Sequence, residues 1–260
     1  MMKHNRIYKQ GMSNADMNKR GQVTIFVIIG IVIVAALLVF FLWVEPTYIS
    51  NRTGRLGFEG CVGDAVEDSI ERLGINAGYV DPDFTFMYRG QDIAYLCYTS
   101  EYHKTCTIQK PFLKQHFENE MSDFLRERIS VCYDSSVDEL LAQGYDVTSG
   151  DVEYDILAEP GVVRVEIEAP TTVGSQRFTR FNVETNTPLY EMLMIATSLL
   201  QYETKYGDSD VSEMMLFYPE YIIDKLKQSD GTTIYIIESK DFGTKFQFAS
   251  RSVAWPPGYF

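Results

Sequence analysis

The sequence predicts an α+β protein, with an N-terminal transmembrane helix followed by an extracytoplasmic mixed domain of antiparallel strands and several amphipathic helices. Three observations lead to this expectation. One uninterrupted apolar run covers residues 23–44. Several later stretches repeat apolar residues at helical spacing, and others alternate apolar and polar residues with a period of two, which is typical of half-buried strands.

The apolar run 23–44 contains 22 residues and no charged side chain. As a helix rising about 1.5 Å per residue it is about 33 Å long, which is enough to cross a hydrocarbon core of about 30 Å. Trp43 stands near its end, where indole rings favour the headgroup region, and Pro46 follows. We therefore expect residues 23–44 to be a transmembrane helix in contact with the lipid bilayer.

The flanking charges predict how this helix is oriented. Residues 1–22 carry a net charge of +4, whereas basic and acidic residues balance just after the run. Because basic residues accumulate on the cytoplasmic side, we expect 1–22 to be a cytoplasmic basic segment. We expect 45–57 to be a juxtamembrane linker and 58–260 to form the extracytoplasmic domain, with a candidate sub-boundary near 149–150.

The outer part of the chain is strongly acidic. The whole chain has a net charge of -13, so residues 45–260 carry -17 once the +4 of the N-terminal segment is set aside. A block this acidic argues against binding to nucleic acid or to an anionic membrane surface.

The residues before the apolar run form a recognisable motif, Lys19-Arg20-Gly21-Gln22 followed by Val23-Thr24-Ile25-Phe26. This basic pair and glycine before an apolar helix resembles the class III signal of archaeal type IV pilin-like proteins. The resemblance implies cleavage by a prepilin peptidase between Gly21 and Gln22 and a mature helix that packs in a filament core. The same opening is similar to that of archaeal single-span membrane proteins, a resemblance that concerns topology only.

Helices in the outer domain are predicted from apolar stripes and their end signals. A stripe begins at Phe58 and ends at Gly74, and Pro111 and Thr187-Pro188 begin two more, since proline is favoured in the first helical turn. The predicted helices cover residues 58–74, 111–132, 137–143, 187–206 and 211–228.

Strands are predicted where the period changes to two. Residues 84–99, with Gly90 near the middle, suggest two strands, and 104–109 a third. Residues 151–183 suggest an antiparallel three-stranded meander with turns at Pro160-Gly161 and Gly174-Ser175. The predicted terminal hairpin comprises 232–238 and 245–250.

All four cysteines follow the apolar run, and an even number in an oxidising compartment favours disulfides. Of the three pairings, we prefer Cys61 with Cys132, which lie on the apolar stripes of two predicted helices, and Cys97 with Cys106, which flank a short hairpin-like segment. The alternative is a zinc site formed by Cys97, His103, Cys106 and one further cysteine, but this spacing is not a common zinc arrangement.

Few other residues suggest chemistry. The sequence lacks the GxSxG, Walker A and HExxH motifs. His116 falls on the polar side of a predicted helix, where we expect it to be solvated. The acidic run 208–213 favours a helix cap at Asp210 with Glu213 reaching back, over a calcium site. Asn51 heads a candidate glycosylation sequon, Asn51-Arg52-Thr53.

The sequence therefore favours a non-enzymatic cell-envelope protein, anchored in the cell membrane by a single span, whose acidic, disulfide-stapled domain faces outward in a binding or structural role. We expect no cofactor and no catalytic or metal site. The expected partners are the lipid bilayer through 23–44 and either a protein partner or further copies of the chain. The alternatives are a peptidase-processed, pilin-like filament subunit and an extracytoplasmic hydrolase that uses carboxylates.

Overall fold

The computed structural model describes residues 29–35 and 57–254 of the chain. The chain divides into two compact units, 1–53 and 54–260. Of the predicted span 23–44, only the helical residues 29–35 are described, and Gly21, Gln22 and Asn51 lie outside the described residues. Across the described ranges, no helix is long and apolar enough to cross a membrane.

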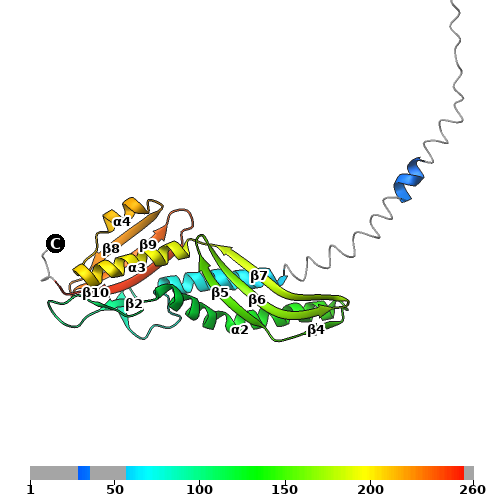
Figure 1. Ribbon diagram of the computed structural model, residues 1–260, viewed down its shortest axis with the longest axis horizontal. Helices are drawn as coiled ribbons and strands as arrows, with labels where there is room; N and C mark the ends of the chain where they lie inside the picture. The colour runs from blue at the N-terminus through cyan, green and yellow to red at the C-terminus, as the bar shows by residue number, and fades with distance from the viewer. Residues whose placement is uncertain (1–28, 36–56, 255–260) are drawn as a thin grey trace, which may run out of the picture. The chain divides into compact units, whose positions relative to one another are not determined.

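The second unit is an α+β fold, as the sequence predicts, and its strands form two sheets (Figure 1). A helix of residues 57–75 opens its described part. The elements that follow are β1 (Thr85–Tyr88), β2 (Gln91–Tyr98), β3 (Thr107–Ile108), α2 (Leu113–Ala142), β4 (Val147–Ser149), β5 (Glu153–Glu159), β6 (Val162–Val173), β7 (Gln176–Asn186), α3 (Leu189–Tyr206), α4 (Val211–Phe217), β8 (Tyr221–Lys227), β9 (Thr232–Ser239) and β10 (Lys245–Arg251).

The larger sheet has the order β1-β2-β10-β9-β8, with β3 also paired to β2. The hairpin of β9 and β10 is antiparallel, as expected, but β10 also pairs in parallel with β2, which makes the sheet mixed. The sequence does not reveal this pairing, because it joins strands about 150 residues apart along the chain and leaves no local turn signal.

The smaller sheet is the predicted meander of β5, β6 and β7, with the short strand β4 added beside β6. The turn glycines Gly161 and Gly174 have positive φ angles of 76° and 59°, which glycine adopts without steric strain. Inward residues such as Val163, Val165 and Ile167 are buried, whereas Glu166 and Glu168, which alternate with them, are exposed. One face of this sheet is therefore part of the core and the other is polar.

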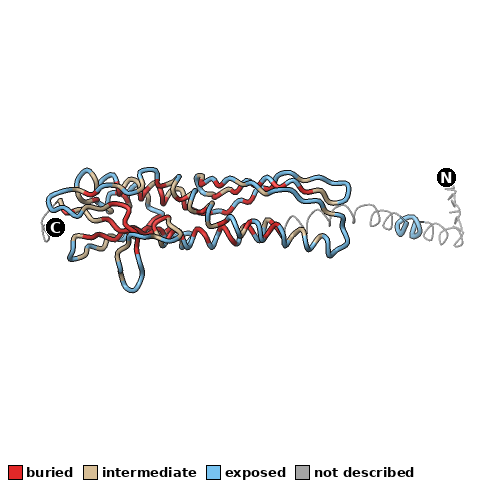
Figure 2. Tube along the Cα trace, turned by 90° about the horizontal axis from the view of Figure 1, so that it is seen from below, coloured by how far each residue is buried: buried red, intermediate tan, exposed pale blue. Residues whose placement is uncertain are grey.

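One hydrophobic core serves both sheets. The predicted stripe of the helix 57–75 is buried except for Cys61, and it packs with inward residues of α2, α3, the meander and the mixed sheet. Figure 1 shows the helix 57–75 and α2 running along the meander, and α3 lying along the mixed sheet. Figure 2 shows the buried chain where these layers meet and the exposed chain on their outer sides. A smaller cluster around Ile93, Tyr95, Ile234 and Ala249 is separate from this core.

The predicted break between helices at 132 and 137 is wrong, because α2 is one helix of 30 residues. The intervening residues contain no glycine or proline, and Tyr133 is buried on the same stripe as Ile129. The hydroxyl of Ser136 donates to the backbone carbonyl of Cys132 at 2.8 Å, so this polar residue is accommodated inside the helix.

The predicted helix 211–228 is also wrong beyond its first turns. α4 ends at Phe217, Pro219 follows, and β8 begins at Tyr221. Proline cannot continue a helix interior. Buried Tyr221 and Ile223 alternate with exposed Ile222 and Asp224, which is the period of a strand.

Two glycines of the helix 57–75 provide a test of how closely this helix packs against the start of β10. A Cβ on Gly74 would collide with the backbone carbonyl of Lys245, whereas a Cβ on Gly60 would meet nothing within 4 Å. We expect Gly74→Ala to lower the free energy of unfolding by about 1–3 kcal/mol through overpacking. The matched variant Gly60→Ala is expected to raise it by about 0.5–1 kcal/mol, as helix propensity dictates. Urea unfolding measures both, and equal effects would contradict the close approach.

Candidate functional site

The two disulfides have the preferred connectivity. Cys61 is bonded to Cys132 and Cys97 to Cys106, with Cα–Cα distances of 5.8 and 5.3 Å. The first bond joins the helix 57–75 to α2, and the second joins β2 to the residue before β3. The zinc alternative is wrong, because each of the cysteines that it requires forms a disulfide bond. Within 29–35 and 57–254, no group of three or more His, Cys, Asp or Glu residues is suited to hold a metal ion.

The acidic run before α4 is a helix cap and a set of ion pairs. The Asp210 carboxylate accepts from the backbone N–H groups of Ser212 and Glu213 at 2.9 and 3.4 Å, which confirms Asp210 as the cap but not the predicted return bond from Glu213. The Asp208 carboxylate pairs with Lys225 and with Lys227. Burial alone would raise the pKa of Asp208, but the two lysines hold it below its ordinary value.

His116 is not solvated, contrary to the expectation from its position on the helix. Its side chain is only 10% exposed and packs edge-on against the Tyr79 ring, 4.4 Å between centroids. The Nε2 atom has no hydrogen-bond partner among the described residues. Burial, assisted by nearby Lys110 and opposed by Glu120, lowers the pKa of His116 to about 4. We therefore interpret His116 as a packing residue, because it is largely covered and its pKa is lowered.

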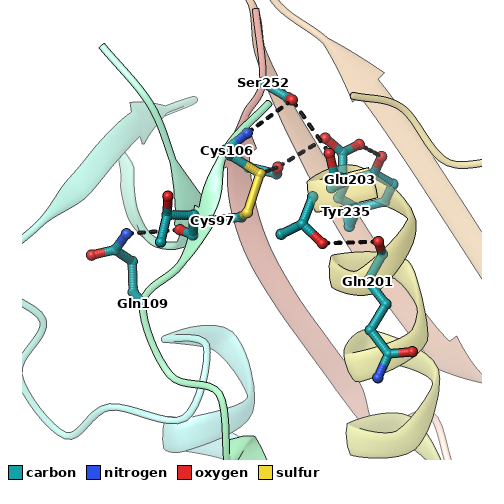
Figure 3. The surroundings of a disulfide bond; sticks show 10 residues. Cys97, Cys106, Gln109, Gln201, Glu203, Tyr235 and Ser252 are labelled. Atoms are coloured by element: carbon teal, nitrogen blue, oxygen red, sulfur yellow. Dashed lines mark hydrogen bonds between the residues drawn. A yellow bond between two sulfur atoms is a disulfide. The ribbon is translucent and has the colours of Figure 1, made fainter. Parts of the chain in front are cut away.

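A buried polar network lies where α3 meets β9 and β10, beside the second disulfide (Figure 3). At its centre is Glu203, which is 1% exposed. One oxygen of its carboxyl group accepts from the Tyr235 hydroxyl, and the other accepts from the Ser250 hydroxyl at 3.1 Å. Tyr235 also contacts the Ser209 hydroxyl at 2.7 Å, and Ser250 lies 3.6 Å from the sulfur of Cys106.

Burial dominates the electrostatics of this network. It raises the pKa of Glu203 above its ordinary value, although the hydrogen bonds from Tyr235 and Ser250 act in the opposite direction. The pKa of Tyr235 is raised as well, by burial and by the adjacent Glu203. Both groups are too deeply buried for a substrate to touch them in this conformation. We therefore interpret the network as a set of buried hydrogen bonds that holds α3 against the mixed sheet.

Sequence reasoning missed Glu203, although a signal was present. The apolar stripe of the predicted helix 187–206 passes through Ala196, Leu199 and Leu200. Continuing the stripe by three or four residues reaches Glu203, so the helical spacing predicts that this charged residue lies on the buried face. A carboxyl group in such a place needs hydrogen-bond partners. They come from β9 and β10, whose approach cannot be read from the helix alone.

A hollow of about 530 Å³ opens where three elements distant in sequence meet. The helix 57–75, the connection from β7 to α3, and the turn between β9 and β10 form its walls. The hollow is lined by Glu67, Ile70, Glu71, Ile75, Thr185, Asn186, Thr187, Phe242, Gly243, Thr244 and Lys245. None of these residues was singled out as a functional residue from the sequence, because no local spacing links the three stretches.

The outer face of the meander carries most of its exposed charge. Strand register places Glu153 directly opposite Glu168 and Asp155 opposite Glu166. Arg180 pairs with Glu168 at 2.8 Å. Like charges at opposite positions of a sheet are unfavourable, but here they face solvent. We interpret this face as a solvated acidic surface.

Comparison of the chain with protein-family models, with curated proteins and with solved structures finds no match. The functional argument therefore depends on the residues and geometry described above.

The raised pKa of Glu203 predicts how stability depends on pH. Below the ordinary carboxyl pKa the folded and unfolded states are both protonated. As pH rises, the unfolded state releases its proton first, so stability is lost up to the raised pKa of the folded state. Glu203→Gln has nearly the same shape but does not titrate. We expect this variant to gain stability relative to the native protein as the pH rises above the ordinary carboxyl pKa, measured by urea unfolding over a pH series.

The control is Glu127→Gln, since Glu127 is an exposed residue of α2. A difference between Glu203→Gln and the native protein that is constant with pH, or one that matches the control, would contradict a raised pKa for Glu203.

Proposed function

We propose that the chain is a single-pass, membrane-anchored cell-envelope protein whose domain 58–260 faces outward in a binding or structural role. The observation that carries this proposal is the exposure of the helical residues 29–35. Five large aliphatic side chains in this short helix are each about half exposed, between 48% and 64%: Ile29, Ile31, Val32, Ile33 and Val34.

These side chains surround the helix. Residues 31–34 are consecutive, and successive residues of an α-helix point about 100° apart, so they cover all sides. A helix that is apolar all round is stable only when other apolar matter covers it, either a protein core or lipid. Its place within the 22-residue apolar run favours lipid.

The disulfides favour the same topology. Cys61–Cys132 and Cys97–Cys106 both lie beyond the apolar run. Structural disulfides persist in oxidising compartments and are rare in the cytosol. The basic segment 1–22 favours a cytoplasmic N-terminus for the same helix. Together these features support an outward-facing domain.

Cysteine labelling on intact cells tests the topology. Ser229→Cys places a thiol in the exposed turn between β8 and β9, and Ser13→Cys places one in the basic segment. With a membrane-impermeant maleimide, we expect Ser229→Cys to be labelled on intact cells and Ser13→Cys only after permeabilisation. The reverse pattern, or release of the protein from membranes by alkaline carbonate, would contradict the proposal.

The second candidate is a processed, pilin-like filament subunit, favoured by the motif Lys19-Arg20-Gly21-Gln22 directly before the apolar run. Processing predicts that the native protein begins at Gln22 and that Gly21→Val prevents cleavage. N-terminal sequencing of protein from its native membrane distinguishes the two. A chain that still begins at Met1 removes the filament candidate and leaves the anchored protein in place.

A further inference from the structure

We propose that the hollow between the helix 57–75, the end of β7 with the residue that follows it, and the β9–β10 turn binds an organic ammonium group. The inference concerns the unit 54–260 alone, so it stands or falls separately from the membrane anchor. It rests on the charge of the hollow, an aromatic ring at its surface, a buried hydroxyl without a partner, and the rigidity of its walls.

The hollow has an uncompensated negative charge. Glu67 and Glu71 are exposed and four residues apart on one helix, so both carboxylates lie on the same side and repel each other. Neither has an ion pair within the described part of the chain. The cation of the hollow, Lys245, is engaged by Glu238 at 3.1 Å. A positively charged ligand would therefore relieve the repulsion.

The aromatic residue of the hollow suits a cation of organic rather than inorganic type. Phe242 lines it and is 56% exposed, so part of its ring is open to a ligand in the hollow. The face of an aromatic ring attracts ammonium groups, and its apolar area also packs against the carbon atoms that carry them. A small metal ion would use only the carboxylates. The ring together with two glutamates therefore favours an amine.

A buried polar group of the hollow lacks a partner. Thr187 lines it, is 3% exposed, and its Oγ1 atom has no hydrogen-bond partner among the described residues. Buried hydroxyl groups are normally paired, so an unpaired one marks a place where a ligand or water is expected. Thr185, Asn186 and Thr244 line the same hollow and add further acceptors for an N–H group.

The walls are fixed before any ligand arrives. Gly74 packs directly on the backbone of Lys245, and the side-chain amide of Gln247 donates to the Ile75 carbonyl at 2.8 Å. On the other side, the backbone N–H of Thr187 donates to the Gly161 carbonyl at 3.1 Å. A preformed site loses little conformational entropy when it binds a ligand.

The size of the hollow indicates what the ammonium group is attached to. A volume of about 530 Å³ is larger than an ammonium group needs, and Ile70 and Ile75 supply apolar wall. The ligand class is therefore an amine with a small aliphatic or ring-shaped body. A lysine side chain, an aliphatic diamine and an amino sugar share this chemistry.

Calorimetric titration of the full-length protein in detergent tests the proposal. The probes are Nα-acetyl-lysine methylamide, putrescine and glucosamine, and their neutral counterparts are Nα-acetyl-norleucine methylamide, butane-1,4-diol and glucose. We expect at least one ammonium probe to bind, with its neutral counterpart at least tenfold weaker. The probe that binds most tightly identifies the kind of body the hollow accepts.

Matched double variants locate the binding. Glu67→Gln with Glu71→Gln is expected to weaken the bound probe at least tenfold. Asp134→Asn with Asp138→Asn removes two charges at the same spacing on an exposed side of α2, away from the hollow, and is expected to change the affinity less than twofold. Phe242→Ala is expected to weaken binding several-fold.

Four results would overturn the proposal. They are the absence of binding by all three ammonium probes, neutral counterparts that bind as well, equal effects of the two double variants, and calcium binding that depends on Glu67 and Glu71 while no amine binds. Equal effects would mean that the probes respond to the overall acidity of the domain. None of these results bears on the labelling pattern that tests the membrane topology.

Discussion

The arrangement of the outer unit depends on how the helix 57–75 packs across both sheets. At its start, the Phe58 ring lies 5.2 Å from Phe181 of the meander and 5.9 Å from Tyr133 of α2. At its end, Gly74 packs on the backbone of Lys245 in the mixed sheet. Because one helix contacts both sheets, their inner faces share a single core. The Cys61–Cys132 bond then fixes this helix to α2 and limits how far the unfolded chain can expand.

Two features follow from this packing. Once the mixed sheet is in place, α3 brings Glu203 against β9 and β10, where Tyr235 and Ser250 satisfy a carboxyl group that would otherwise be very unfavourable in the core. The hollow forms at the junction itself, because its walls belong to the helix, to the end of the meander and to a turn of the mixed sheet. A rigid junction of this kind suits recognition of a small group better than the open acidic face of the meander does.

Much of the fold was predictable from the sequence, because the evidence was local. The stripe from Phe58 to Leu73, the turns at Gly161 and Gly174, and the pairing of Cys97 with Cys106 follow from periodicity, turn chemistry and short separation. The errors also have local causes. The spacing of apolar residues in 211–228 fits a helix, but Pro219 ends it. The polar residues after Cys132 suggested a break between two helices, whereas one helix continues through them.

The remaining features were not predictable, because they depend on contacts between distant residues. The parallel pairing of β10 with β2, the partners of Glu203 and the hollow all require tertiary structure. His116 shows the same limit, since a position on the polar side of α2 became buried when the turn at Gly78 and Tyr79 packed over it. Helix amphipathicity indicates which side faces the main core, but it does not exclude burial by another segment.

The central claim is that both sheets depend on one shared core. Native-state hydrogen exchange tests it most directly, because it measures the free energy at which each amide opens. Val165 in β6 and Ile237 in β9 are fully buried members of the core on different sheets. A shared core predicts that their slowest amides open together, with free energies equal within about 1 kcal/mol and equal to that of global unfolding. A meander that opens at a much lower free energy than the mixed sheet would contradict the claim and show two independently stable parts.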